Sequence, residues 1–401
     1  MILNKSTEEG RPSVGIVYPH LDRGGSEAHA VWGLQALRGL YRMSFLTIDD
    51  VDLGPLNEFY GTALADGDFT VLPPTLPRWI REGHRLSVLR EAVFYRHVVA
   101  RARELDVLIS THNCLNVGVP AIQYIADLYF DEELSLQYLH RSAPPIGPLR
   151  KAYHTCVRTV FGAPRTDLLA RDMVLVNSRW TGQIITRKFG VPVHLLYPPV
   201  AACPVPVSLD GRENGFVCLG RLVPEKKIEQ IVRIVAQVRQ LGHDVHLHIV
   251  GGLDGSPYCQ RLQDLCRGLE WVRLEGLLSG VQKWELLARH RYGLHACPGE
   301  AFGIVVAEMM VAGCVVFVPA GGGPDELVNM AELSYRDEAE AVHKIARVLN
   351  DPAELKRLHI YMLERGRQFG TERFMAELRG YVEQFLAQKG RNPVGAGVTN
   401  P

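Results

Sequence analysis

Short apolar segments alternate with segments of helical periodicity along most of this chain. In the first half, a β-branched run at residues 14–18 is followed by a Gly-rich turn at 22–27 and by helical spacing at 28–40. In the second half, the apolar run at 216–219 precedes helical spacing at 228–241. A strand, a turn and a helix repeated in this way are typical of mostly parallel sheets covered by helices on both faces. The pattern therefore predicts an α/β fold.

The chain divides into two halves at a segment rich in proline and small residues. With 401 residues it is too long for one compact core. Residues 198–214 read PPVAACPVPVSLDGREN, which is typical of an interdomain connection. We predict Rossmann-like domains at 1–200 and 201–375 that face a cleft. Residues 376–401 are expected to form a helix that packs back on the first domain, followed by a disordered tail.

Charge and cysteine content exclude several classes of protein. Lys plus Arg and Asp plus Glu both number 44, so the net charge is zero and we expect no nucleic-acid partner. None of the eight cysteines forms a C-x-x-C pair, which argues against a zinc site and against a disulfide framework. The N-terminus lacks the apolar run of a signal peptide, and Glu308 lies inside the longest apolar stretch, 301–320. We therefore expect a cytoplasmic protein.

Two cations follow the first strand of the second half. Arg221 and Lys226 lie between that strand and the next helix. Ligands of parallel sheets bind at the carboxyl ends of strands, where helix N-termini point. A guanidinium fork and an ammonium at this place are suited to phosphate oxygens. The alternative is a pair of solvated surface cations beside a turn.

A second segment, PGEAFGI at 298–304, is expected to begin a helix that contains Glu308. Gly299 and Gly303 would let backbone amides approach an anion closely. Glu300 and Glu308 are eight positions apart, so both can lie on one helix face and accept hydroxyl groups of a ribose and a sugar. The alternative for Glu308 is a helix-surface acid, but its apolar neighbours indicate a buried carboxylate that needs a partner.

The glycine run 321–323, followed by Pro-Asp-Glu, is either a flexible loop or a loop of close backbone approach.

The second half resembles the donor half of family 4 retaining glycosyltransferases, which have the B-type fold. The resemblance lies in the segments GRLVPEK, PGEAFGIVVAEMMVAG and GGGPDEL. The first half is similar to that family more loosely, in GGSE at 24–27, THN at 111–113, VNSRWT at 176–181 and LLYPPV at 195–200. The resemblance covers about residues 14–385.

The resemblance implies an acceptor-binding first domain, a donor-binding second domain and a role for each matching residue. The donor diphosphate would be held by Arg221, Lys226 and backbone amides near Phe302, Gly303 and Ile304, with Gly24 and Gly25 facing the phosphates or the acceptor. Glu308 would bind the ribose, and Glu300 would hold hydroxyl groups of the donor sugar in the catalytic site. The base would lie near Leu277 and Leu278.

Two positions depart from the family pattern. Lys227 stands where the family usually has glycine, a change that the start of a helix is expected to tolerate. Ala126 stands where many members carry a histidine, and Asp127 follows it. Asp127 or His112 is therefore the candidate for orienting the acceptor hydroxyl or the reacting sugar.

No metal or other cofactor is expected, since the nucleotide sugar is a co-substrate. Asp50-x-Asp52 and Asp66-x-Asp68 have the D-x-D spacing with which A-type glycosyltransferases bind a divalent cation. That spacing is common in loops, and the cationic residues Arg221 and Lys226 already suit a diphosphate.

A basic, apolar segment at 76–103 concerns the acceptor. Its arginines are Arg78, Arg81, Arg85, Arg90, Arg96, Arg101 and Arg103. Such a helix can dock on anionic lipid or bind an anionic acceptor, although it can equally pack its apolar face in the first domain. Arg150, Lys151 and Arg158 form a second basic stretch. We hypothesise peripheral contact with the inner face of an anionic membrane and a lipid-linked or phosphorylated acceptor.

The sequence thus predicts a metal-independent, retaining glycosyltransferase of the hexosyltransferase type. It would move a sugar from a UDP or GDP sugar to a hydroxyl group of a lipid-linked, polysaccharide or glycoconjugate acceptor. The alternatives are a sugar-nucleotide epimerase of the same fold and a non-catalytic protein that binds nucleotide sugars.

Overall fold

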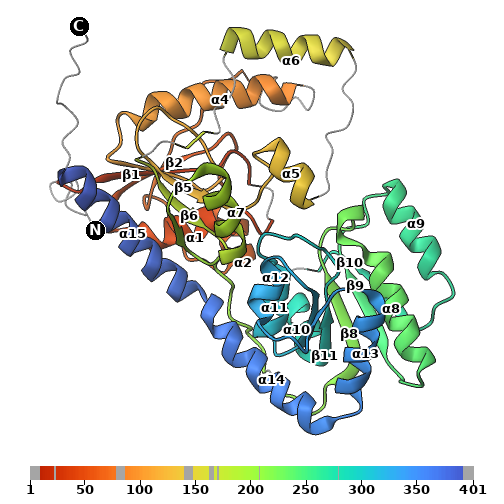
Figure 1. The fold of residues 1–401 in the computed structure, drawn as a ribbon. Coiled ribbons are helices and arrows are strands. Elements are labelled where there is room, and N and C mark those ends of the chain that lie inside the picture. The colour runs from red at the N-terminus through yellow and green to blue at the C-terminus, as the bar shows by residue number, and fades with distance from the viewer. Residues whose placement is uncertain are drawn as a thin grey trace, which may run out of the picture. The chain divides into compact units, whose positions relative to one another are not determined.

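A computed structural model describes residues 10–21, 24–77, 86–139, 148–161, 167–168, 171–206, 208–278 and 280–391. The chain forms two compact α/β units, shown in Figure 1. The first comprises Met1–Asn177, Gly182–Pro199 and Glu372–Pro401, and the second comprises Ser178–Thr181 and Val200–Thr371. Most of the connection near residue 200 therefore belongs to the second unit.

The first unit is built on a seven-stranded parallel sheet of order β3-β2-β1-β4-β5-β6-β7. Chain order reverses between β1 and β4, as in the Rossmann arrangement. The strands are β1 (Ser13–Val17), β2 (Arg42–Leu46), β3 (Thr70–Val71), β4 (Val107–Ser110), β5 (Ile122–Ile125), β6 (Met173–Val176) and β7 (Val193–Leu195).

The first unit contains helices as well as this sheet. They are α1 (Ala28–Leu37), α2 (Leu53–Tyr60), α4 (Ser87–Ala102), α5 (Glu132–Leu139), α6 (Pro148–Phe161), most of α7 (Arg179–Phe189) and α15 (Thr371–Arg391). In α15, Phe374, Leu378, Val382 and Phe385 recur at helical spacing and belong to the same buried cluster as Ile16 of β1. The end of the chain is thereby fixed to the first unit, while the tail beyond Arg391 lies outside the described residues.

The second unit repeats the architecture with a six-stranded parallel sheet of order β10-β9-β8-β11-β12-β13. Its strands are β8 (Glu213–Leu219), β9 (His246–Val250), β10 (Val272–Gly276), β11 (His290–Leu294), β12 (Val315–Pro319) and β13 (Ser334–Tyr335). Its helices are α8 (Ile228–Gln240), α9 (Pro257–Cys266), α10 (Gly280–Arg289), α11 (Ile304–Val311), α12 (Gly323–Val328), α13 (Glu338–Leu349) and α14 (Pro352–Gly366), with 3₁₀ turns at Pro224–Lys226 and Arg367–Phe369. The predicted α/β fold with two Rossmann-like halves is confirmed.

The boundaries of one strand differ from those that the sequence predicts. The apolar run at 293–296 predicts a strand there, but β11 occupies His290–Leu294. The strand begins with His290 and Arg291, whose polar side chains break the apolar pattern. His290 is nevertheless fully buried, because the Leu286 carbonyl oxygen and the His246 side chain supply its polar contacts.

Among the described residues of the basic segment 76–103, α4 is the helical part, and its apolar side is in the core. Phe94, Val98 and Ala102 are buried in one cluster with Leu46 and Leu108 of the sheet. The core-packing alternative is therefore correct for this face of the helix. Arg78, Arg81 and Arg85 lie outside the described residues. Within the described part of the chain, none of the helices combines the length and apolarity needed to cross a bilayer.

Candidate functional site

The predicted diphosphate ligands follow β8, at the point where the strand order of the second sheet reverses. β8 lies between β9 and β11, so the loops after β8 and β11 leave neighbouring strands at this switch point. Gly220 ends the strand with φ 145°, and the exposed Arg221 follows it. Lys226 closes the 3₁₀ turn Pro224–Lys226, and Lys227 separates it from α8.

Lys226, His295 and Glu300 form a compact charged cluster in this loop region. Lys226 Nζ lies 2.8 Å from Glu300 Oε1, and His295 Nε2 lies 2.7 Å from Glu300 Oε2. His295 follows β11 and is almost completely buried, whereas the Glu300 side chain keeps 20% of its surface exposed. Each carboxylate oxygen thus has a basic side chain close to it, and part of the Glu300 side chain remains reachable from solvent.

Electrostatics keep this cluster charged. Burial alone would raise the pKa of Glu300, but Lys226 and His295 outweigh burial and hold that pKa well below its usual range. Burial opposes the charge of Lys226 as well, yet Glu300 raises the pKa of the Lys226 ammonium above its ordinary value. The nearby charge of Arg221 acts in the opposite direction on Lys226. The site therefore presents fixed cations beside an ionised carboxylate.

Glu300 lies in the loop before α11 rather than on the helix. The helix begins at Ile304, and Gly303 precedes it in the left-handed region with φ 91°. The prediction that Glu300 and Glu308 share one helix face is therefore wrong. Gly303 ends the loop instead, because the chain needs a positive φ there that other residues rarely adopt. The structure places Phe302, Gly303 and Ile304 at the N-terminal end of the helix, where backbone amides lack intrahelical partners.

The glycine run after β12 brings two loops into close contact. The Gly323 amide donates to the Glu300 carbonyl oxygen at 2.8 Å. A Cβ atom on Gly323 would lie 2.4 Å from both the Ala301 oxygen and the Phe302 Cα atom. The sequence allowed either a flexible loop or a loop of close backbone approach at 321–323, and close backbone approach is therefore correct for Gly323. This contact positions the segment that carries Glu300.

Glu308 has the partner that its apolar surroundings require. Lys283 of α10 places its Nζ atom 2.6 Å from Glu308 Oε1, and the Glu308 side chain is 15% exposed. Leu277, at the end of β10, is 80% exposed, while Leu278 is half-buried. An exposed leucine after a strand of this sheet is suited to contact with a planar base, so the predicted roles of Leu277, Leu278 and Glu308 stay predictions.

Lys227 shows why the family position favours glycine. Its backbone is left-handed, with φ 49° and ψ 44°, and it precedes the first residue of α8. This conformation costs an L-residue about 1–2 kcal/mol.

We therefore expect Lys227→Gly to stabilise the second unit by up to about 1 kcal/mol, since the greater entropy of glycine in the unfolded chain offsets part of the relief. Chemical denaturation monitored by circular dichroism measures this change. An unchanged or lower denaturation midpoint would contradict the prediction.

In the first unit, Asp127 has a local structural function. Its Oδ1 atom accepts from Asn113 Nδ2 at 2.9 Å and from the Tyr129 amide at 2.8 Å. His112 is exposed and packs edge-on against Tyr18, with ring centroids 5.1 Å apart. These contacts fix the loops after β4 and β5, and the predicted roles of Asp127 and His112 toward an acceptor stay predictions.

Other predicted features of the first unit have structural contacts too. The Gly24 carbonyl accepts from the Tyr60 hydroxyl at 2.9 Å, and Gly25 is part of the same turn. Asp52 accepts from the Gly54 amide at the start of α2, at 3.1 Å. Asp68 pairs with Arg38 at 3.0 Å. These two D-x-D aspartates therefore have local structural partners.

Two residues of the charged pairs could not be identified from the sequence. His295 carries a weak signal, since it directly follows an apolar run at the same sheet edge as Arg221. Lys283 carries no such signal, because a lysine in a predicted helix is ordinarily solvated.

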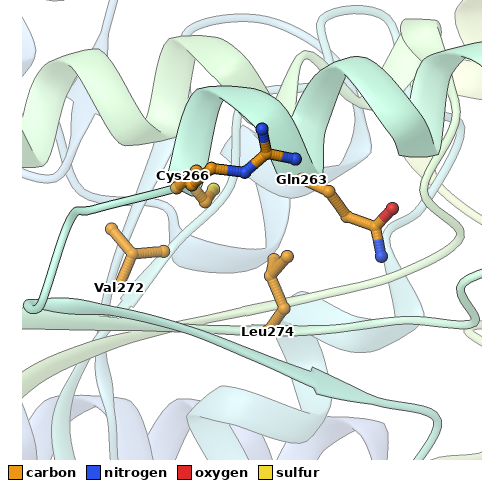
Figure 2. Close-up of a pocket in the computed structure, with 5 residues that line it drawn as sticks. Gln263, Cys266, Val272 and Leu274 are labelled. Carbon is orange, nitrogen blue, oxygen red and sulfur yellow. The ribbon is translucent and has the colours of Figure 1, made fainter.

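A separate shallow hollow of about 470 Å³ lies between α9 and β10 (Figure 2). It is lined by Gln263, Cys266, Arg267, Val272 and Leu274, and none of the predicted site residues is among them.

Comparison with protein families gives a match in the second unit. Residues 205–365 match the family model of glycosyl transferases group 1. This range contains Arg221, Lys226, Glu300 and Glu308.

Two curated relatives match this chain over part of its length. A GDP-Man:Man(3)GlcNAc(2)-PP-Dol alpha-1,2-mannosyltransferase of Dictyostelium discoideum is 24% identical over 247 residues, covering 55% of this chain and 48% of the relative. A GDP-mannose-dependent alpha-(1-6)-phosphatidylinositol monomannoside mannosyltransferase of Mycolicibacterium smegmatis is 28% identical over 180 residues, covering 42% of this chain and 46% of the relative. The aligned region thus amounts to slightly less than half of each relative.

A similar solved structure is that of Anabaena HepE in complex with UDP and glucose. It superposes with a TM-score of 0.63 at 16% identity, over 93% of this chain and 100% of that chain. At this identity the similarity concerns the fold.

Proposed function

We infer that this chain belongs to the group 1 glycosyl transferases through residues 205–365. From this premise we propose that it transfers a hexose from a nucleoside-diphosphate sugar to a hydroxyl group of a lipid-linked acceptor. The observation that carries the proposal is the cluster of Lys226, His295 and Glu300 at the switch point of the second sheet. Ligands of open parallel sheets bind at such a point.

The cluster supplies what departure of a nucleoside diphosphate requires. Negative charge grows on the diphosphate as the bond to the sugar breaks, and fixed cations stabilise it without reorganisation. Arg221 and Lys226 would provide this charge, assisted by backbone amides near Phe302, Gly303 and Ile304. We propose that these groups do so without a divalent metal.

Glu300 is suited to positioning the sugar. Oε1 accepts a hydrogen bond from Lys226, and Oε2 lies 2.7 Å from His295 Nε2, yet a carboxylate has about four lone-pair sites, so sugar hydroxyl groups can still be bound. A carboxylate with a basic side chain close to each oxygen is a poor nucleophile toward the anomeric carbon, which argues against attack by Glu300. We propose retention of configuration because the family resemblance implies it, and NMR of the product anomer tests it. An inverted product would contradict this part of the proposal.

The donor to test first is GDP-mannose, since both curated relatives are named for it. A thermal-shift panel of GDP, UDP and ADP with their sugars, without added metal, tests donor choice. At a ligand concentration of about 100 times the dissociation constant, binding stabilises the folded protein by roughly 2.7 kcal/mol. We expect GDP and GDP-mannose to raise the melting temperature most. A larger shift with UDP sugars would reassign the donor, and no shift with any nucleotide would contradict the site.

For the acceptor, α6 of the first unit is better suited than α4 to contact a membrane surface. Leu149 is 88% exposed and Val160 is 62% exposed, and Lys151 on the same helix is exposed as well. Exposed apolar side chains beside a cation are typical of helices that lie in the interface of an anionic bilayer. We propose that the protein contacts the inner face of the membrane, where a lipid-linked acceptor would be presented, from the cytoplasmic side.

The double variant Leu149→Ser, Val160→Ser is expected to reduce sedimentation with anionic liposomes by about tenfold or more, since each buried side chain of this kind contributes roughly 1.5–3 kcal/mol. Leu241→Ser is the matched control, because Leu241 is 59% exposed in the second unit. If the wild-type protein does not bind anionic liposomes at low salt, or if all three proteins bind them equally, this surface is ruled out.

A further inference from the structure

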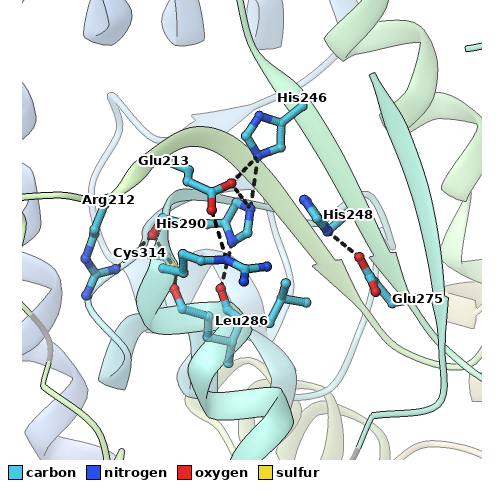
Figure 3. A network of polar contacts seen from close by, with 10 residues as sticks. Arg212, Glu213, His246, His248, Glu275, Leu286, His290 and Cys314 are labelled. Atoms are coloured by element: carbon cyan, nitrogen blue, oxygen red, sulfur yellow. Dashed lines mark hydrogen bonds and ion pairs between the residues drawn. The ribbon is translucent and has the colours of Figure 1, made fainter. Parts of the chain in front are cut away.

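Four metal-ligating side chains gather at the edge of the second sheet opposite to the donor site. Glu213, His246 and His290 are the first residues of β8, β9 and β11, and His248 follows on β9. Arg221 and His295, in contrast, follow the carboxyl ends of β8 and β11. Figure 3 shows the four side chains converging from three adjacent strands. Each offers one ligand atom, and these atoms all lie within 4.8 Å of one another.

The spacing of three of these atoms is that of metal ligands. His246 Nε2 lies 3.0 Å from His290 Nε2 and 3.2 Å from Glu213 Oε2, and His290 Nε2 lies 3.5 Å from Glu213 Oε2. Bonds of about 2.0–2.1 Å to a tetrahedral zinc ion place ligand atoms roughly 3.3–3.4 Å apart. The three atoms therefore outline one face of such a tetrahedron.

In His290 and His248, the ring nitrogen Nδ1 has an oxygen partner, as is usual for histidines that bind a metal through the other nitrogen. His290 Nδ1 lies 2.7 Å from the Leu286 carbonyl oxygen, which can only accept, so this nitrogen carries the proton and Nε2 has the lone pair. His248 Nδ1 lies 2.5 Å from Glu275 Oε1, and its other nitrogen faces the side of His246 and His290 in Figure 3. A carboxylate or carbonyl behind a histidine fixes the ring for a metal.

The backbone leaves room for this arrangement. A Cβ atom on Gly215 would lie only 2.2 Å from His246 Nε2, so glycine on β8 lets the imidazole lie against the strand. His290 and His248 are 0% and 1% exposed, while the His246 and Glu213 side chains are 32% and 41% exposed. The buried pair is thus rigid, and the exposed pair gives an ion access. Arg289 Nε holds the other carboxylate oxygen of Glu213 at 3.0 Å, which leaves Oε2 for the site.

We propose that Glu213, His246, His248 and His290 bind one divalent transition-metal ion, with zinc as the expected ion. Three imidazoles and one carboxylate oxygen supply four ligands, which is the coordination number of zinc in structural sites. An ion there links the beginnings of β8, β9 and β11 and stabilises the second sheet. Because four protein groups fill its coordination sphere and it lies at the opposite sheet edge, it takes no part in sugar transfer.

Zinc titration of the chelator-stripped, tag-free full chain tests this proposal. A competing chromophoric chelator reports affinity, and Co²⁺ reports geometry through its visible absorption. We expect one zinc per chain, an intense tetrahedral Co²⁺ spectrum and a rise in melting temperature on the order of 5 °C near saturation. His246→Asn, at a partly exposed position, should lower zinc affinity at least about tenfold.

His343→Asn on the exposed side of α13 is the matched control and should bind zinc as the wild type does. A second group of potential ligands, His295, Cys297 and Glu300, belongs to the donor region. Zinc bound there would be unaffected by His246→Asn, so equal affinity in the wild type and this variant would overturn the proposal. Absence of stoichiometric zinc binding by correctly folded wild-type protein would overturn it as well.

Discussion

Replacing Lys226 by alanine is expected to lower kcat/KM for sugar transfer by about 10²–10³, because one preorganised contact to the developing diphosphate charge is lost. The variant also removes the cation that lies 2.8 Å from Glu300 Oε1. The carboxylate then keeps only His295, so its pKa should rise and its hold on sugar hydroxyl groups should weaken. Steady-state release of nucleoside diphosphate measures the effect.

The neighbouring variant Lys227→Gly is the matched control. It removes an equal charge one position along, from an exposed side chain, and should retain turnover. Melting curves of both variants separate lost chemistry from lost folding, since Lys226→Ala leaves a partly buried carboxylate less well paired. If folded Lys226→Ala turned over normally, or if Lys227→Gly were equally impaired, the assignment of Lys226 would be wrong.

Gly323→Ala is expected to destabilise the second unit by about 1–3 kcal/mol and to abolish detectable donor binding, as for other overpacked positions. The new methyl group would meet backbone atoms of Ala301 and Phe302 at 2.4 Å, and backbone cannot move aside as a flexible side chain does. The loop that carries Glu300 must shift to accommodate it. Chemical denaturation and nucleotide thermal shifts measure the two effects.

Gly252→Ala is the appropriate control for this substitution. A Cβ atom on Gly252 would meet nothing within 4 Å, and its backbone does not require a positive φ. It should therefore leave nucleotide binding intact. Wild-type stability and nucleotide affinity in Gly323→Ala would show that the close approach of the two loops is unimportant.

The sequence was sufficient for the fold and for the pairing of segments around the donor site. Alternation of apolar runs and helical spacing predicts parallel sheets, and Arg221, Lys226 and Glu300 follow from their positions after strands. The sequence was insufficient where polar residues are buried. His290 begins β11 as a buried histidine, so apolar periodicity placed that strand three residues too late.

Contacts between segments that are far apart in the sequence were the other feature that could not be predicted from the sequence. The conclusion from cysteine spacing, that no zinc site is present, is now opposed by a proposal built on histidines. Glu213, His246 and His290 are far apart in sequence, and only the order β9-β8-β11 brings their strands together. In the same way, Lys283 of α10 and Glu308 of α11 form an ion pair that no local pattern predicts.

The most direct test of the central claim is transfer of radiolabelled sugar from a panel of nucleotide sugars to lipid-linked acceptors, by the full chain without added magnesium or manganese. We predict that label from GDP-mannose enters the lipid phase, and that Lys226→Ala reduces the rate by about 10²–10³. Absence of both transferred label and released nucleoside diphosphate with every donor, from protein with a normal melting curve, would contradict the account.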